Sequence, residues 1–153
     1  MTDALPADLP AGLPAAISSF LPELRSIRRD LHAHPELAFQ EIRTTAVVTD
    51  RLSAAGISWR PVPGMTGAIA DLGAEQPAYR VGLRADMDAL PVRERTGLDW
   101  ASTVPDVCHA CGHDVHTAAV LGAGLVLQEL EDDPRERGIG VRPLFQPAEE
   151  VIP

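Results

Sequence analysis

The chain has 153 residues, of which 45% are hydrophobic and only 4% are aromatic. This length and composition fit one domain with an aliphatic core built from Leu, Val, Ile and Ala. The 13 Lys and Arg residues against 22 Asp and Glu residues give a formal net charge of -9, and such an acidic surface argues against nucleic acid and against anionic membranes as partners.

The amino-terminal segment lacks the basic and continuous apolar stretches of a secretory signal. No part of the sequence approaches the roughly 20 apolar residues that a transmembrane helix needs. We therefore expect a soluble, cytoplasmic protein. Residues 1–13 are rich in Pro, Ala and Gly and are predicted to form a flexible leader, with the domain itself over residues 14–153.

Three helices are predicted from the sequence. Apolar residues recur every three or four positions over residues 17–31, which predicts an amphipathic helix that ends before Pro35. A second helix is predicted over residues 41–55, where Gly56 stops it, and a long third helix over residues 112–130.

Four short strands are predicted between and after these helices. They cover residues 57–62, 66–72, 79–85 and 139–145. The alternation of helices and strands favours an α/β sandwich over a helical bundle or an all-β fold. Acidic residues follow two of the strands, and in open α/β sheets functional residues gather where strands end.

The densest group of potential metal ligands lies where the third helix is predicted to begin. Two cysteines and three histidines occur within Cys108-His109-Ala110-Cys111-Gly112-His113-Asp114-Val115-His116. Thiolates and neutral imidazoles bind zinc and related metals well, and a helix N-terminus is expected to lower a thiol pKa. Because Gly112 permits a sharp turn, Cys111 and His113 can face one centre. We prefer this interpretation to a helix cap with incidental histidines.

Two pairs of carboxylates follow predicted strands. Glu149 and Glu150 repel each other, whereas a metal site would use one as a ligand and the other as a general base. Taken alone, this pair would more readily be a solvated acidic loop. Asp86 and Asp88 stand two positions apart, so in extended backbone they point the same way. A role in the site and a role in a turn are equally favoured for this second pair.

Two further features have simpler interpretations. His32 and His34 lie at the end of the first helix, where basic residues oppose the helix dipole, and we prefer this to metal ligation. Cys108 and Cys111 form a C-x-x-C pair, which makes a thiol–disulfide redox module an alternative function. That alternative leaves His113 and the carboxylates without a role.

Four motifs, taken in order along the chain, resemble the M20 metallopeptidase family. They are Arg29-x-x-His32-x-His34-Pro35-Glu36-Leu37, Arg84-Ala85-Asp86-Met87-Asp88-Ala89-Leu90-Pro91, His109-Ala110-Cys111-Gly112-His113-Asp114-x-His116-Thr117 and Phe145-Gln146-Pro147-Ala148-Glu149-Glu150. The resemblance is to the amidohydrolase branch, which includes hippurate hydrolases, N-acyl-amino-acid amidohydrolases and indole-acetyl-amino-acid hydrolases.

The resemblance implies a three-layer α/β/α zinc-peptidase-like catalytic domain, of which residues 14–153 would be the N-terminal portion. It implies hydrolysis of the amide bond of N-acyl amino acids, such as hippurate-like substrates, by metal-activated water at two divalent ions, zinc, manganese or similar. By position, Cys111, His113 and Glu150 become metal ligands. Glu149 becomes the general acid/base, and Asp88 becomes an aspartate that orients a ligand.

The sequence departs from the family pattern in two ways. The family continues through a smaller lid domain and takes further histidine ligands from that part, whereas this chain stops at Pro153. We therefore expect an N-terminal fragment with weak metal affinity and negligible turnover, a possible homodimer only in full-length form, and we keep a non-catalytic remnant as a further alternative. The family does not usually have a cysteine at position 108.

Overall fold

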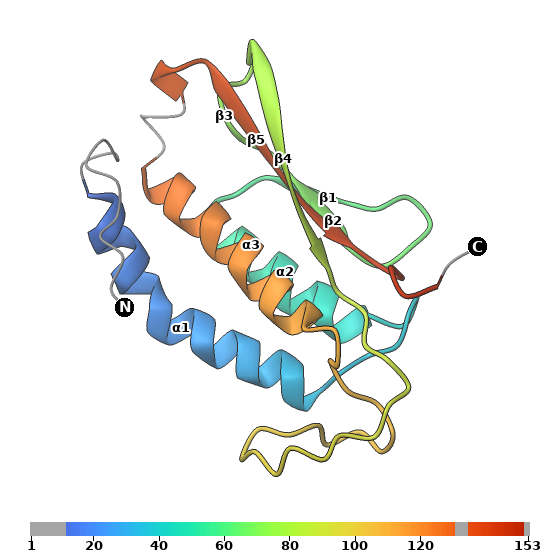
Figure 1. The fold of residues 1–153 in the computed structure, drawn as a ribbon. Coiled ribbons are helices and arrows are strands. Elements are labelled where there is room, and N and C mark those ends of the chain that lie inside the picture. The colour runs from blue at the N-terminus through green and yellow to red at the C-terminus, as the bar shows by residue number, and fades with distance from the viewer. Residues whose placement is uncertain (1–11, 131–134, 152–153) are drawn as a thin grey trace.

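The computed structural model describes residues 12–130 and 135–151 as a layer of helices against a mixed β-sheet (Figure 1). The helices are α1 (Leu13–Ala33), α2 (Ile42–Ala54) and α3 (His113–Glu129). The strands are β1 (Trp59–Pro61), β2 (Ala68–Ala70), β3 (Leu72–Gly73), β4 (Tyr79–Asp86) and β5 (Ile139–Gln146). This order confirms the predicted α/β class. Most of the predicted leader lies outside the described residues.

The strand β5 lies at the centre of the sheet. It pairs in parallel with β4 on one side and antiparallel with β2 and β3 on the other, while β1 continues the sheet beyond β2. The single strand predicted over residues 66–72 is therefore two short strands, interrupted at Asp71. Because β4 and β5 are parallel and joined through α3, their C-terminal ends meet at the same edge of the sheet.

All three described helices lie on one face of the sheet (Figure 1). Helix α3 contacts β3, β4 and β5, α2 lies beside β1 and β2, and α1 packs against α3. The two helices α1 and α3 approach closely, since a Cβ atom at Gly122 would lie 2.5 Å from the Leu24 side chain. The described residues thus provide the sheet and one helical layer of the α/β/α arrangement.

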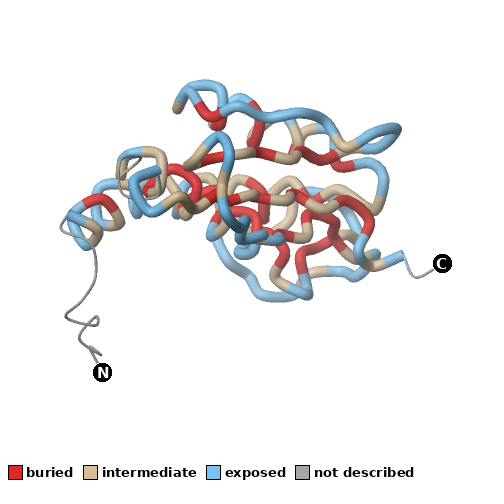
Figure 2. Tube along the Cα trace, turned by 90° about the horizontal axis from the view of Figure 1, so that it is seen from above, coloured by how far each residue is buried: buried red, intermediate tan, exposed pale blue. Residues whose placement is uncertain are grey.

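An aliphatic core fills the space between these two layers. Its fully buried members come from α2, α3 and the strands, and they include Val48, Leu52, Met87, Leu121 and Phe145. Buried positions gather where the helices face the sheet, whereas β1 and most of β4 are exposed (Figure 2). The predicted core of Leu, Val, Ile and Ala is therefore present, with Phe145 as its large aromatic member. None of the described helices has the length and apolar character needed to cross a bilayer.

The loop between β1 and β2 lies against the end of β5 at Gly67. This residue has a φ of +94°, and a Cβ atom there would lie 2.5 Å from the carbonyl oxygen of Phe145. A residue with a Cβ atom at position 67 would therefore be strained in its backbone and would clash with the carbonyl of Phe145. Gly67 thereby allows the loop to approach the segment that leads from β5 to Glu149.

We expect Gly67→Ala to destabilise the fold by about 3 kcal/mol, because it combines a left-handed backbone cost with a clash against backbone. The matched control is Gly64→Ala, since Gly64 also has a positive φ (+73°) but open space around it. The control should cost only about 1 kcal/mol. Urea unfolding followed by circular dichroism measures both, and equal losses would contradict the close approach.

Candidate metal centre

The predicted site residues meet at the edge of the sheet where β4 and β5 end. Asp88 follows β4, and Glu149 and Glu150 follow β5. The Met87 amide donates to the Gln146 carbonyl over 3.0 Å, so the two strand ends remain paired just before they diverge. Helix α3 begins at the same edge with His113. The arrangement follows the general rule that sites form beyond the C-terminal ends of parallel strands.

The turn into α3 brings a thiol and an imidazole to a common centre. Gly112 occupies the N-cap with a left-handed φ of 87°, a conformation that residues with a Cβ atom disfavour. Each of Cys111, His113 and Glu150 offers a ligand atom, and these three atoms lie within 4.8 Å of one another. The structure therefore brings together the three residues that the sequence predicted as metal ligands.

The imidazole of His113 is held in one orientation by Asp88. Its Nδ1 lies 2.8 Å from the Asp88 carbonyl oxygen, which can only accept, so Nδ1 carries the hydrogen. The other ring nitrogen, Nε2, then has a free lone pair and lies 3.8 Å from carboxylate oxygens of both Glu149 and Glu150. A ligating histidine commonly has its remaining N–H fixed in this way.

Asp88 also holds the two glutamates. Its side chain is buried, with 1% of the residue exposed. Oδ1 accepts the Glu149 amide at 3.1 Å, and Oδ2 accepts the Glu150 amide at 2.9 Å. One aspartate thus connects His113 from α3 with the turn after β5. Of the two roles left open for Asp88, a place in the site agrees with this geometry.

The donor set fits a divalent cation. A thiol, an imidazole and a carboxylate suit zinc and similar borderline metals. Oε1 of Glu150 is buried and has no hydrogen-bond partner among the described residues, which is costly unless another group satisfies it. A cation between Cys111, His113 and Glu150 would supply that partner.

The two cysteines do not have the properties of a redox pair. A hydrogen bond to Glu150, burial and the nearby negative charges of Glu149 and Asp88 raise the pKa of Cys111. Burial chiefly raises the pKa of Cys108. The expectation that the helix N-terminus lowers the Cys111 pKa is therefore wrong, because the carboxylates outweigh the helix. A redox-active C-x-x-C pair needs a lowered thiol pKa, so the thiol–disulfide alternative is disfavoured.

Asp86 and His116 lie beside the centre. The ligand atoms of Asp86, His113 and His116 also lie within 4.8 Å of one another, and the His116 ring stacks on His113 with 5.3 Å between centroids. However, Arg84 Nε donates to Asp86 over 2.7 Å. Because Arg84 already neutralises this carboxylate, we regard the group as weaker than the one containing Cys111.

His32 and His34 differ in their surroundings. His34 Nδ1 bonds the Asp30 carbonyl at 2.8 Å, which agrees with the predicted capping role at the end of α1. His32 is buried instead, with Nδ1 2.8 Å from Asp114 and Nε2 3.1 Å from Glu94. It ties the end of α1 to the start of α3, a role that helix-end reasoning did not suggest.

Sequence reasoning missed two polar residues around the centre, the buried Glu41 and the half-buried Glu94, and it did not predict the burial of His109 within the ligand cluster. Burial lowers the pKa of His109 to about 4, and neither of its ring nitrogens has a hydrogen-bond partner among the described residues. Glu94 lies in the polar loop over residues 91–107. The sequence carried no signal that either glutamate turns inward, since both lie among other polar residues.

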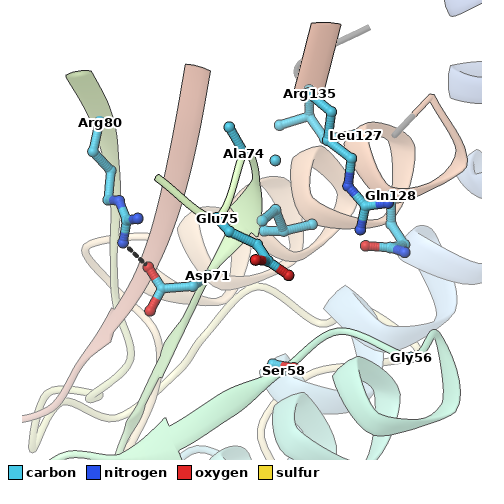
Figure 3. A pocket seen from close by; sticks show the side chains of 11 residues that line it. Gly56, Ser58, Asp71, Ala74, Glu75, Arg80, Leu127, Gln128 and Arg135 are labelled. Atoms are coloured by element: carbon cyan, nitrogen blue, oxygen red, sulfur yellow. Dashed lines mark hydrogen bonds and ion pairs between the residues drawn. The ribbon is translucent and has the colours of Figure 1, made fainter. Parts of the chain in front are cut away.

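A polar hollow of about 410 Å³ lies at the opposite end of the sheet (Figure 3). It is lined by residues from the start of β4, the end of α3 and β3, including Arg80, Glu75 and Gln128. It contains no residue predicted for the site, and its Arg80 is already paired with Asp71. The hollow is therefore separate from the candidate metal centre.

Residues 82–153 match peptidase family M20/M25/M40, and this range includes Asp88, Cys111, His113, Glu149 and Glu150. Almost half of the chain therefore matches this family. An N-acetyl-L-cysteine deacetylase of Bacillus subtilis (strain 168) is 46% identical over 138 residues, which are 90% of this chain and 32% of that protein. An N-acyl-L-amino acid amidohydrolase of Geobacillus stearothermophilus is 47% identical over 82% of this chain and 33% of that protein.

A solved structure from the M20 family also matches this chain. A dinuclear metal-binding peptidase of Bacillus subtilis from the M20 family matches with a TM-score of 0.80 and 42% identity, over 88% of this chain and 37% of that one. The resemblance indicated by the four motifs is thus confirmed, together with the α/β fold of an M20 catalytic domain. The chain spans about a third of the length of the relatives it matches.

The half-buried Glu94 allows a prediction of how the stability of the fold depends on pH. Burial by itself raises the pKa of Glu94, but hydrogen bonds from the Ser102 amide and the Thr96 hydroxyl and the contact with His32 outweigh it and lower the pKa from 4.5 to about 2. Because the folded pKa is depressed, the contribution is complete above pH 4.5 and is lost as the pH falls to about 2.

Glu94→Gln should therefore flatten the fall in stability between pH 4.5 and 2, as measured by urea unfolding at a series of pH values. Glu75→Gln, at an exposed position, controls for the loss of one negative charge. Equal acid sensitivity of the Glu94 variant and the wild type would contradict the role of Glu94.

Proposed function

We propose that this chain supplies one side of a two-metal site that hydrolyses the amide bond of N-acyl amino acids. The convergence of Cys111, His113 and Glu150 within 4.8 Å supports this most directly. Two relatives, an N-acetyl-L-cysteine deacetylase and an N-acyl-L-amino acid amidohydrolase, act in agreement with this reaction. The dinuclear description of the solved relative agrees with two ions.

In this proposal Cys111, His113 and Glu150 hold the metal, which is zinc, manganese or a similar ion. When bound, divalent ions supply Lewis acidity that polarises an amide carbonyl and lowers the pKa of water. The protein's part is to fix the ligands: Asp88 selects the His113 tautomer and anchors the Glu150 amide. The thiol of Cys111 must lose its proton on binding, since the thiolate is the ligand.

Glu149 is the proposed general acid/base. Its side chain is 40% exposed, so water and substrate reach it, whereas Glu150 is more enclosed at 21%. Glu149 takes the proton of the attacking water and later delivers it to the leaving nitrogen. Asp88 acts through His113 and the amides of the two glutamates, and it is therefore a positioning residue.

We further propose hippurate-like substrates, a cytoplasmic location and a homodimer of the full-length protein, all of which stay predictions. The described residues offer only a few ligand side chains for two ions. We therefore propose that residues 1–153 alone bind metal weakly and turn over substrate negligibly, because a complete site needs more ligands than Cys111, His113 and Glu150 provide.

Two single substitutions separate the metal site from a redox pair. Cys111→Ser should reduce zinc affinity at least about tenfold, because it removes a thiolate ligand. The matched control Cys108→Ser should leave zinc affinity nearly unchanged, because Cys108 is buried away from the other ligands. Isothermal titration calorimetry with zinc measures the affinities of both variants, and loss of zinc binding in the Cys108 variant would contradict the proposed ligand set.

The proposed acid/base role predicts the effect of Glu149→Gln in a polypeptide that contains this chain and hydrolyses N-acyl amino acids. The rate should fall by at least about 10²-fold, with metal content unchanged. Hydrolysis of hippurate and N-acetylcysteine, together with metal analysis, measures this. A surviving rate would show that Glu149 is not the base, and appreciable turnover by residues 1–153 alone would contradict the need for further ligands.

A further inference from the structure

Glu41 stands at the N-cap of α2, yet its carboxylate does not cap that helix. The capping is done by Glu36, whose two oxygens accept the amides of Arg43 (2.9 Å) and Thr44 (2.7 Å). An acidic N-cap side chain ordinarily accepts an amide from the first turn of its own helix. Since Glu36 occupies those amides, the carboxylate of Glu41 is free to bond elsewhere.

The carboxylate of Glu41 reaches the turn after β5 instead. Glu41 is fully buried, with 0% exposure. Its Oε1 accepts the Ala148 amide at 2.8 Å, and its Oε2 accepts the hydroxyl of Thr66. A buried carboxylate is costly unless it is hydrogen-bonded, so these two bonds stabilise it there. The bond to Ala148 connects residues that are 107 positions apart.

The turn needs such support because of the conformation of Ala148. Its φ is 55°, in the left-handed region that residues with a Cβ atom disfavour. The next two amides, of Glu149 and Glu150, both donate to Asp88. Three consecutive amides are therefore bonded to two buried carboxylates, one from the start of α2 and one from the end of β4.

We propose that Glu41 is a positioning residue of the metal centre. It fixes the left-handed turn at Ala148, and this turn directs the side chains of Glu149 and Glu150 towards Nε2 of His113. The effect of Glu41 on metal binding rests on the proposed function. Its role in fixing the turn at Ala148 does not depend on that function. Asp88 alone fixes two amides but leaves the entrance of the turn at Ala148 unsupported.

The first test uses the metal-free chain and compares Glu41→Gln with Glu36→Gln, a matched substitution at the start of the same helix. Amide hydrogen exchange is followed by NMR. Glu41→Gln should speed exchange at residues 148–150 by about tenfold or more relative to the amides of β5. Glu36→Gln should speed exchange at Arg43 and Thr44 and leave residues 148–150 unchanged.

The second test is a titration with Co²⁺, which reports on the thiolate through its charge-transfer absorption. Glu41→Gln should weaken cobalt binding by about tenfold and alter the spectrum, as expected for a residue that orients a ligand. Glu36→Gln should lower the unfolding temperature without either change. Adding Ala148→Gly to Glu41→Gln should restore part of the affinity, because glycine adopts the left-handed turn readily.

The outcomes are separable. A wild-type chain that binds no cobalt would overturn the proposed function, while exchange at residues 148–150 would still decide the role of Glu41. If Glu41→Gln does not fold, Thr66→Val removes one partner of Glu41 at a half-buried position and should produce a smaller increase in exchange at Ala148. Unchanged exchange at residues 148–150 in whichever variant folds would overturn the inference.

Discussion

The buried carboxylate of Asp88 is the group on which the candidate centre depends. The carboxylate accepts the amides of Glu149 and Glu150, and the backbone carbonyl of Asp88 fixes the ring of His113. These contacts join three segments that are far apart in sequence, namely the end of β4, the start of α3 and the turn after β5. Such a hub is possible only because β4 and β5 run in parallel and end together.

The rest of the fold serves to hold that edge in place. Helix α3 packs across β4 and β5, and its first turn is secured by Asp114, which lies 2.8 Å from both Arg28 and His32 of α1. On the far side, Gly67 lets the loop before β2 approach the end of β5. The aliphatic core beneath supplies the stability, while the polar contacts determine where the ligand side chains lie.

Much of the fold follows from periodicity in the sequence, because helical stripes and strand-like runs depend on neighbouring residues. The predicted helix over residues 41–55 corresponds to α2, and the run over 139–145 to β5. The break between β2 and β3 at Asp71 was not predicted, and Asp71 makes ion pairs there with Arg60 of β1 and Arg142 of β5, contacts that form only on folding.

The site could be predicted in part for the same reason. Cys111 and His113 are close in sequence, so their convergence required only a turn at Gly112. Their proximity to Glu150 was suggested by the position of strand ends and is present in the structure. The raised pKa of Cys111 and the inward turn of Glu41 escaped prediction because both depend on side chains brought together by folding.

The way in which the buried carboxylates are stabilised also bears on the metal site proposed at this edge. Asp114, on the α1 side, is paired with Arg28 and hydrogen-bonded to His32, so the guanidinium of Arg28 compensates its charge. Glu41 and Asp88 are bonded to backbone amides instead, which satisfy their hydrogen bonds without supplying a full positive charge. Arg84 does reach this edge, where it bonds Asp86 and forms a longer ion pair of 3.7 Å with the exposed Glu149.

Negative potential therefore remains around Cys111, Glu149 and Glu150, and the raised pKa of the Cys111 thiol is its visible consequence. A divalent cation would reverse that effect by stabilising the thiolate and both carboxylates together. Amide-bonded carboxylates thus keep the ligands fixed in geometry while leaving their charge for the metal to neutralise.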